Sequence, residues 1–262
     1  MSAALTTLGI GAAIVATLMF ALWLVHLATK NASIVDAGWA GGIGILGIVY
    51  ALRADGDPLR AWTIAAMGAV WGLRLASHLL ARIIGEPEEG RYVQLRNEWK
   101  TNLGAKFLLF FEFQALLCVV LSLPLLIPTL NATRGLTPPE IAGVALWFVA
   151  IGGEALADQQ LRAFKANPAN RGTTCCAGLW NYSRHPNYFF EWLIWVSFAL
   201  FASASPWGWL GWISPALILF FLLRVTGIPA TEAQSLRSRG DEYRRYQETT
   251  SAFFPWFPKG TT

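Results

Sequence analysis

Long apolar stretches separated by shorter polar segments run along the whole chain. A helix needs about 20 apolar residues to cross about 30 Å of hydrocarbon, because it rises about 1.5 Å per residue. Seven stretches approach or exceed that length, and we expect each to form a membrane-crossing helix. The short stretch 189–202 leaves six or eight crossings as alternatives. The seven are Ala4–Leu27, Ile34–Leu52, Ala61–Ala81, Lys106–Leu126, Ile141–Ala157, Phe189–Ala202 and Trp207–Val225.

The composition agrees with a membrane-embedded, all-α helix bundle. Hydrophobic residues make up 55% of the chain against 14% charged residues, and the mean hydropathy is +0.44, far from the values of soluble domains. The 13 Trp and 16 Phe suit the aromatic belts at a bilayer surface. We therefore expect residues 1–262 to form one membrane-embedded domain, with its first apolar stretch retained rather than cleaved as a signal peptide.

The positions of Lys and Arg predict the orientation. Short cytoplasmic loops carry an excess of these residues, and the seven-crossing arrangement satisfies that rule if the N-terminus lies outside and the C-terminus in the cytoplasm. The outer segments then hold only Arg53, Arg60 and Arg134. The long polar stretches 82–105 and 158–188 both fall on the cytoplasmic side. The net charge of +4 is thus assigned to topology and phosphate binding, and we expect no nucleic-acid partner.

Cysteines indicate neither a disulfide framework nor a metal site. Cys175 and Cys176 are adjacent, which rarely allows disulfide geometry, and Cys118 is far from them in the sequence. We expect a reducing, cytosol-facing environment and no metal.

Several ionisable residues fall within the apolar stretches, where each costs at least about 2.5 kcal/mol unless it has a partner or a function. Glu154, Asp158 and Arg162 recur every four residues and Lys165 follows, so they share one helical face. Such a polar stripe favours a ligand cavity, with buried ion pairs between helices as the alternative. Glu112 and Glu154 receive no assigned role. The set is Asp36, Arg74, His78, Glu112, Glu154, Asp158, Glu191 and Arg224.

The segment around Arg184 and His185 carries the densest signal for a site. Pro186 suits the first turn of a helix, so the two cationic residues lie beside a helix N-terminus, which favours anions. Upstream cations at Arg171 and on the polar stripe suit a ligand with several phosphates. We predict a phosphate or carboxylate cradle; an interfacial anchor is the alternative.

The tail from Glu232 to Tyr246 predicts an amphipathic cytoplasmic helix with a turn at Gly240. Tyr243 and Tyr246 lie three residues apart, so they share a face and either stack on a ligand or pack internally.

These motifs carry a resemblance to a known superfamily. Arg184-His-Pro-x-Tyr188-x-x-Glu191, followed by Glu232 and Gly240-x-x-Tyr243-x-x-Tyr246, resembles the steroid 5α-reductases, sterol Δ14-reductases and isoprenylcysteine carboxyl methyltransferases. Upstream patches look like the bacterial branch of the steroid 5α-reductase family. They are Ser33-Ile-Val-Asp36-x-x-Trp39, Glu88-Glu-x-Arg91-Tyr92-x-x-Leu95-Arg96, Asp158-x-Gln-Leu-x-x-Phe164-Lys165, Asn167-Pro-Ala-Asn-Arg-Gly172 and Ser251-Ala-Phe-Phe-Pro255.

This resemblance implies a seven-helix fold that encloses NADPH within its later helices and reduces the Δ4 double bond of 3-oxo steroids. Hydride addition to an enone places negative charge on the ketone oxygen, so a donor must stabilise it. Asp36 is our candidate, because an apolar setting favours a neutral carboxyl that donates a hydrogen bond. The family pairs this acid with a Tyr of the third helix, which is absent here, so Tyr92 or His78 takes that place. The alternative for Asp36 is a salt bridge to Arg74.

The resemblance also implies a cofactor site formed without a Rossmann motif, since no glycine fingerprint follows a strand. The cations favour NADPH, whose 2′-phosphate adds charge. Residues 1–105 are assigned to the substrate side and 106–262 to the cofactor side. The cofactor-binding candidates are Asp158, Arg162, Lys165, Arg171, Tyr182, Arg184, His185, Asn187, Tyr188, Glu191, Arg224, Glu232 and Tyr243.

Two other functions compete with the reductase. A methyltransferase of the isoprenylcysteine type, dependent on S-adenosylmethionine, would share the tail motifs but would not need an acid at Asp36. A seven-helix receptor or a transporter is the other competitor, but the seventh stretch holds no Lys that could form a retinal Schiff base, and neither paired half-helices nor an inverted repeat stands out. We expect an apolar, steroid-like enone as substrate, contacts with membrane lipid, no obligate protein partner, and a bacterial inner membrane location with the site facing the cytoplasm.

Overall fold

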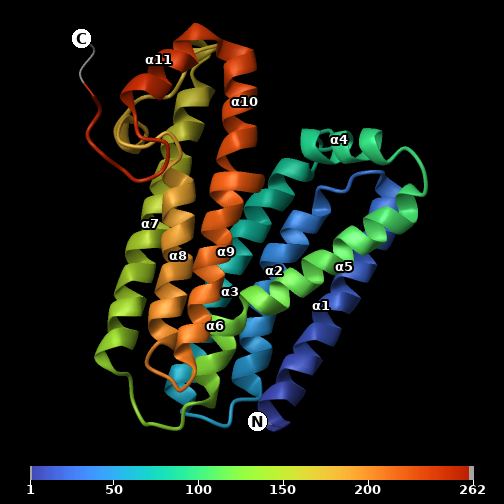
Figure 1. Ribbon diagram of the computed structural model, residues 1–262, viewed down its shortest axis with the longest axis vertical. Coiled ribbons are helices and arrows are strands. Elements are labelled where there is room, and N and C mark those ends of the chain that lie inside the picture. Colours follow the sequence, from blue (N-terminus) through green and yellow to red (C-terminus); the bar gives the residue numbers. More distant parts are fainter. Residues whose placement is uncertain (1, 260–262) are drawn as a thin grey trace. The chain divides into compact units, whose positions relative to one another are not determined.

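The computed structural model describes residues 2–259. Over these residues the chain is 78% helical and contains no strand, which confirms the all-α class (Figure 1). Within the same range, six helices are long and apolar enough to cross a membrane. The predicted sixth stretch forms helix α8 (Pro186–Ala202), whose 17 residues fall short of that length. The chain is thus built as an integral membrane protein, while seven crossings and their orientation stay predictions.

The helices form two compact units. The first contains residues 1–140 and 201–211, and the second contains residues 141–200 and 212–262. These units are defined by packing, so the predicted division of roles at residue 105 stays a prediction.

The first unit is organised around α2 (Ile34–Leu52), which packs against α1 (Ser2–Thr29), α3 (Pro58–Ile83) and α5 (Leu103–Leu121). Short polar α4 (Gly90–Trp99) lies between α3 and α5 in the sequence. The predicted stretch 106–126 is not one helix. It divides into α5 and the short α6 (Leu123–Leu126), because Pro124 lacks the N–H that a continuous helix would need, and the 3-10 turn η1 (Ile127–Leu130) follows.

Glycines allow α2 and α3 to approach closely. A Cβ atom placed on Gly72 of α3 would lie 2.6 Å from the carbonyl oxygen of Ala40 and 3.1 Å from the backbone of Gly44, both on α2. Only a residue without a side chain fits there, so the helix contact depends on this position.

The second unit contains most of α7 (Pro138–Ala166) and α8, which stand side by side in Figure 1. Its remaining helical segments follow the 3-10 turn η4 (Gly208–Trp212), of which only the last residue belongs to this unit, and end with α11 (Asp241–Thr249). Helix α7 has 29 residues and exceeds the predicted apolar stretch, because the polar stripe continues the helix beyond it. Between η4 and α11 lie α9 (Ile213–Phe220), the π-helical turn η5 (Phe221–Val225) and α10 (Ile228–Arg239).

The predicted turn at Gly240 is confirmed. This residue has φ +55°, a left-handed conformation, and separates α10 from α11. The short 3-10 turns η2 (Pro168–Asn170) and η3 (Gly178–Asn181) lie in the long segment between α7 and α8.

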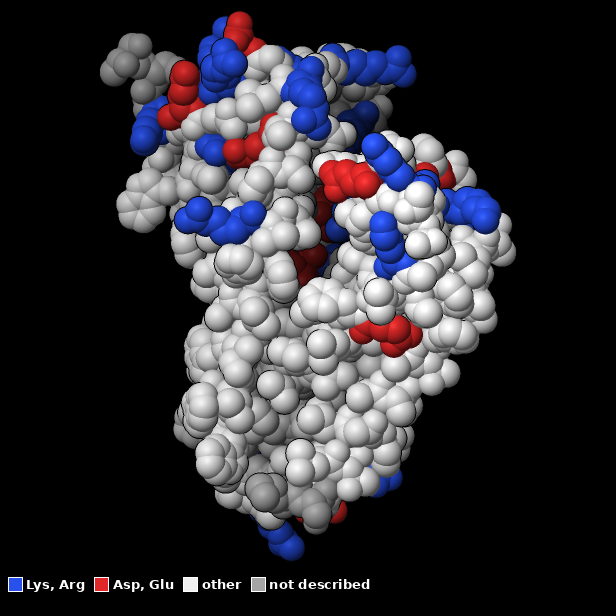
Figure 2. Space-filling model, turned by 45° about the vertical axis from the view of Figure 1, so that its right-hand side comes forward, with Lys and Arg blue, Asp and Glu red and all other residues white. Residues whose placement is uncertain are grey.

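Charged residues are unevenly distributed on the molecular surface. In the face shown in Figure 2, wide areas of the surface carry neither blue nor red side chains. Such a distribution is expected of helices that cross an apolar layer.

Candidate functional site

A cluster of three residues joins the start of α2 to the start of α4 in the first unit. The Tyr92 hydroxyl donates a hydrogen bond to Oδ1 of Asp36 over 2.7 Å. On the other side of the carboxyl group, Nη2 of Arg91 donates to Oδ2 and forms an ion pair. Tyr92 is buried, with 1% of its surface exposed, whereas the Arg91 side chain is 45% exposed. Both oxygens of Asp36 are therefore held by donors.

The protonation states of the two α4 residues are well determined by their surroundings. Burial, with the nearby Asp36 carboxyl as a second cause, raises the pKa of the Tyr92 hydroxyl well above its ordinary value, so it keeps its proton. Burial acts against the charge of Arg91, but the Asp36 carboxylate outweighs it and raises the pKa of the guanidinium. Both groups consequently remain donors at neutral pH.

Neighbouring polar contacts fix α4 in this position. The Glu88 carboxylate accepts from the backbone N–H of Ala32 over 2.8 Å and from the Arg96 guanidinium over 2.9 Å. The backbone N–H of Glu89 donates to Oγ of Ser33 over 3.0 Å. The segment before α2 is thereby tied to the segment before α4, and the Asp36 cluster is preorganised.

An open hollow of about 480 Å³ adjoins this cluster. Ser33, Arg82 and Glu89 contribute to its lining, and Glu89 also lies 3.2 Å from Nη2 of Arg91. Glu89 therefore links the lining of the hollow to the Asp36 cluster.

The structure separates the sequence-based candidates around Asp36. It brings Tyr92 into contact with Asp36, and it assigns the ion pair at this carboxyl to Arg91, where the sequence suggested Arg74 as the alternative partner. Arg74 and His78 are both half-buried on α3. The catalytic roles of Asp36, Tyr92 and His78 stay predictions.

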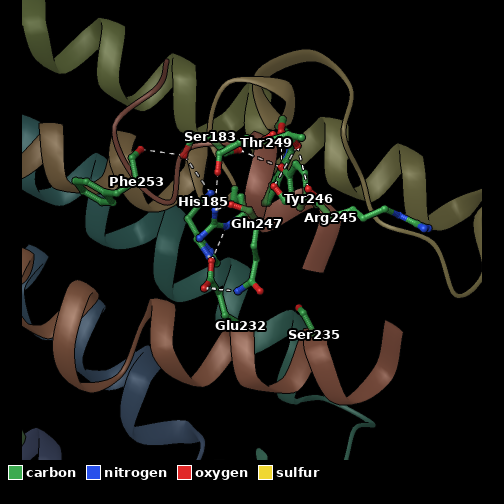
Figure 3. A network of polar contacts seen from close by, with 12 residues as sticks. Ser183, His185, Glu232, Ser235, Arg245, Tyr246, Gln247, Thr249 and Phe253 are labelled. Carbon is green, nitrogen blue, oxygen red and sulfur yellow. Dashed lines mark hydrogen bonds and ion pairs between the residues drawn. The ribbon is translucent and has the colours of Figure 1, made fainter. Parts of the chain in front are cut away.

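A second network, in the second unit, is centred on Glu232 of α10 (Figure 3). Its Oε1 accepts from Nε of Arg184 over 2.7 Å and lies 3.3 Å from Nε2 of His185. Its Oε2 accepts from the Gln247 side-chain amide over 2.8 Å. Residues from α10, α11 and the segment before α8 thus meet at one carboxylate.

The start of α8 accounts for the position of Arg184 and His185. Pro186 begins the helix, and the backbone N–H of His185 donates to Oγ of Ser183 over 3.1 Å. The backbone N–H of Arg184 donates to the carbonyl of Ser251 over 2.8 Å, and its Nη1 donates to the carbonyl of Gln247 over 2.9 Å. Arg184 is therefore strongly engaged with protein acceptors, and its predicted role toward an anionic ligand stays a prediction.

The polar stripe of α7 faces the start of α8. The Asn187 side-chain amide donates to Oδ1 of Asp158 over 3.4 Å. One and two turns further along α7, Arg162 and Lys165 are exposed. On α8, Glu191 accepts from the indole N–H of Trp195 over 3.0 Å. The stripe and the start of α8 together therefore combine a carboxylate, an amide and two solvent-facing cations.

The remaining candidates are spread over the second unit. The Tyr188 hydroxyl lies 3.3 Å from Oγ1 of Thr231. Tyr243 is buried with the Arg239 guanidinium above its ring, and burial followed by the Glu232 carboxylate raises the pKa of its hydroxyl. The exposed candidates are Arg171, Tyr182 and Arg224. Their part in cofactor binding stays a prediction.

Three contacts were not found by reasoning from the sequence. Arg91 stands next to Tyr92 in a motif, which was the available signal for its contact with Asp36. No periodic pattern predicted the contact of Gln247 with Glu232. The same is true of the bond from the backbone N–H of Thr174 to Oε1 of Glu242 over 2.8 Å. Their partners are distant in sequence, so only the fold brings them together.

Comparisons with known proteins identify the family. Residues 22–250 match the family described as "Protein of unknown function (DUF1295)". The chain belongs to this family, which is part of the steroid 5α-reductase-like membrane superfamily. It is also similar to "Uncharacterized protein C594.04c" of Schizosaccharomyces pombe, with 27% identity over 89% of this chain and 75% of the relative. No solved structure matches the chain.

Proposed function

We propose that this member of the steroid 5α-reductase-like superfamily is an NADPH-dependent reductase of a carbon–carbon double bond conjugated to a ketone. The substrate is an apolar, steroid-like enone. The observation that carries this proposal is the Asp36 cluster, in which Tyr92 donates to one oxygen of the carboxyl and Arg91 to the other. We further propose seven crossings, with α8 as the sixth, in a bacterial inner membrane with the site on the cytoplasmic side.

The cluster suits the charge that develops in this reaction. NADPH, when bound, supplies a hydride to the β-carbon of the enone. In this proposal the Tyr92 hydroxyl turns from Asp36 to donate a hydrogen bond to the carbonyl oxygen, on which negative charge accumulates, and the Asp36 carboxylate, held by Arg91, positions that hydroxyl. A proton from water then completes the reduction at the α-carbon. Arg91 adds a positive charge beside the same oxygen. Because Tyr92 is protonated and buried, it donates without a prior proton transfer.

The donor set of the second unit fits a dinucleotide phosphate. Asp158 and Asn187 offer an acceptor and a donor suited to ribose or amide groups, and the exposed Arg162 and Lys165 offer cations for phosphates. In this proposal the polar stripe of α7 binds the cofactor. Arg184 and Glu232, which pair with each other, hold the neighbouring segments in position and thereby support the site.

The test measures the loss of NADPH absorbance by the purified protein in detergent with progesterone, together with the product mass. We expect a product heavier by two hydrogens, and a loss of turnover in Tyr92→Phe and Asp36→Asn. Tyr50→Phe is the matched control, because Tyr50 is also buried in the first unit and bonds Ser122 over 2.9 Å, away from the cluster. It should keep its turnover.

Each outcome has a distinct meaning. Binding of NADPH without turnover of several apolar enones would contradict the substrate class and leave the cofactor assignment standing. Binding of S-adenosylmethionine in place of NADPH would replace the reductase by the methyltransferase.

A further inference from the structure

A short aromatic segment precedes the C-terminus. We refer to residues 252–258, Ala-Phe-Phe-Pro-Trp-Phe-Pro, as the aromatic strap. Three of its large apolar side chains face outward: Phe254 is 55% exposed, Trp256 73% and Phe257 75%. Large apolar side chains exposed this close together mark an interaction surface.

The strap is held in place by its backbone. The N–H of Trp256 donates to the carbonyl of Tyr182 over 2.9 Å, and the N–H of Lys259 donates to the carbonyl of Thr249 over 2.8 Å. The Ser183 hydroxyl donates to the carbonyl of Phe253 over 2.9 Å, as drawn in Figure 3. Two prolines in the strap restrict its backbone further. The outward rings are therefore presented on a fixed support.

The strap is continuous with the apolar surface of α8. The ring of buried Phe253 lies 5.8 Å from that of Phe189 and 5.9 Å from that of Trp192, both in the first two turns of α8. The exposed Phe254 ring contacts the same two rings, at 6.0 and 5.8 Å. The apolar flank of the helix thus extends without a break onto the strap.

The chemistry of this surface favours a lipid bilayer as the occupant. Trp and Phe with cationic neighbours are the residues that settle at the boundary between headgroups and acyl chains. The strap is followed directly by Lys259, which is exposed and suits an anionic headgroup. The patch also merges with the apolar flank of a helix, in a chain whose described residues include six helices of membrane-crossing length.

We propose that the aromatic strap docks on the bilayer interface beside the start of α8, with Trp256 and Phe257 inserted at the boundary between headgroups and acyl chains. The strap thereby fixes the segments that precede α8, to which it is hydrogen-bonded, against the membrane surface. This proposal is independent of the reaction that the protein catalyses.

The test uses nitroxide labels in full-length protein reconstituted into vesicles of phosphatidylcholine and phosphatidylglycerol. Cys118, Cys175 and Cys176 are replaced by Ala, and the label is attached in Trp256→Cys or, separately, in Phe257→Cys. Glu248→Cys is the matched control, because Glu248 is exposed on the neighbouring α11. Collisions of each label with oxygen, which partitions into lipid, are compared with collisions with a water-soluble nickel chelate.

We expect the ratio of oxygen to nickel collisions to be several-fold higher at 256 and 257 than at 248. An equal ratio at all three positions would place the strap in water and overturn the proposal. Labels at 256 and 257 that are shielded from both reagents and broadened by a neighbouring spin would show a second copy of the chain on the strap, which would also overturn it. Size-exclusion profiles identify any variant that fails to fold. If one of the two strap variants fails, the other one provides the measurement.

Discussion

Arg60 and Glu140 form an ion pair whose two side chains are both completely buried. Nε of Arg60 donates to Oε1 of Glu140, and Nη2 donates to Oε2 over 3.3 Å. The remaining guanidinium donors are satisfied by main-chain carbonyls, among them that of Asn131 over 3.0 Å and that of Gly135 over 2.6 Å. One side chain at the start of α3 thus holds the loop that leads to α7.

Loss of this arginine should destabilise the first unit. Arg60→Met leaves Glu140 buried without a counter-ion, which costs about 3–5 kcal/mol. We expect a clear decrease in the unfolding temperature in detergent, followed by circular dichroism. Arg60→Met combined with Glu140→Met should recover only part of the loss, because the loop carbonyls still lack donors.

The control for Arg60 is Arg244→Ala. Arg244 pairs with Asp241 at the surface, where both side chains are mostly exposed, and such pairs contribute little. The Arg244→Ala variant should unfold at the same temperature as the unmodified protein. Equal effects at the two positions would contradict the assigned importance of the buried pair.

Gly72 should tolerate no side chain. In Gly72→Ala the added methyl group meets the Ala40 carbonyl oxygen, so α2 and α3 must separate, at a cost of about 1–3 kcal/mol. Gly152→Ala on α7 is the matched control, because nothing lies within 4 Å of a Cβ atom there. We expect a lower unfolding temperature for the first variant only, and an unchanged Gly72→Ala protein would refute the close approach of the helices.

Arg91 should affect turnover more than cofactor affinity. Arg91→Ala removes the cation beside Asp36, and we expect kcat to fall about tenfold or more while KM for NADPH stays constant. Arg82→Ala is a matched control. Arg82 forms an ion pair with Glu89, as Arg91 does, whereas the ion pair to Asp36 is formed by Arg91. Steady-state kinetics with progesterone distinguish the two. If kcat fell equally in both variants, the role of Arg91 would be limited to holding α4 in place.

The two groups of cations in the second unit should behave differently. Arg162→Ala and Lys165→Ala remove exposed charges, so we expect weaker NADPH binding that is sensitive to salt, with no change in stability. Arg184→Ala leaves Glu232 without its guanidinium, at a cost of about 2–3 kcal/mol in stability. Fluorescence titration of NADPH and thermal unfolding measure the two effects. Unfolding caused by the α7 variants would contradict their assignment to ligand binding.

Cys176 should react slowly with alkylating reagents despite its exposure. Although the residue is exposed, partial burial of its thiol, followed by the Glu242 carboxylate, raises the pKa of the thiol to about 11, and only the thiolate reacts. Because this value lies above pH 9, the rate of reaction with iodoacetamide should rise about 100-fold from pH 7 to pH 9. Glu242→Gln removes a negative charge, lowers the pKa and should speed alkylation at pH 7. Mass spectrometry of the labelled peptide follows the rates, and a plateau below pH 9 would disagree with the raised pKa.

The sequence alone determined the fold class and the positions of most helices. Apolar runs such as 34–52 have only one way to satisfy their backbone polar groups in lipid, so α2 begins and ends where its pattern predicts. Gly240 was also identifiable, because its left-handed backbone conformation favours glycine. Local chemistry was sufficient in these cases.

Tertiary structure decided which side chains meet. Asp36 and Tyr92 are 56 residues apart and Arg184 and Glu232 are 48 apart, and no periodic pattern links either pair. The choice of Arg91 for the carboxyl of Asp36, and of Glu232 for Arg184, depends on how the polar segments fold over the helix ends. The sequence shows that a charged residue in an apolar run needs a partner. Which residue becomes that partner depends on long-range packing.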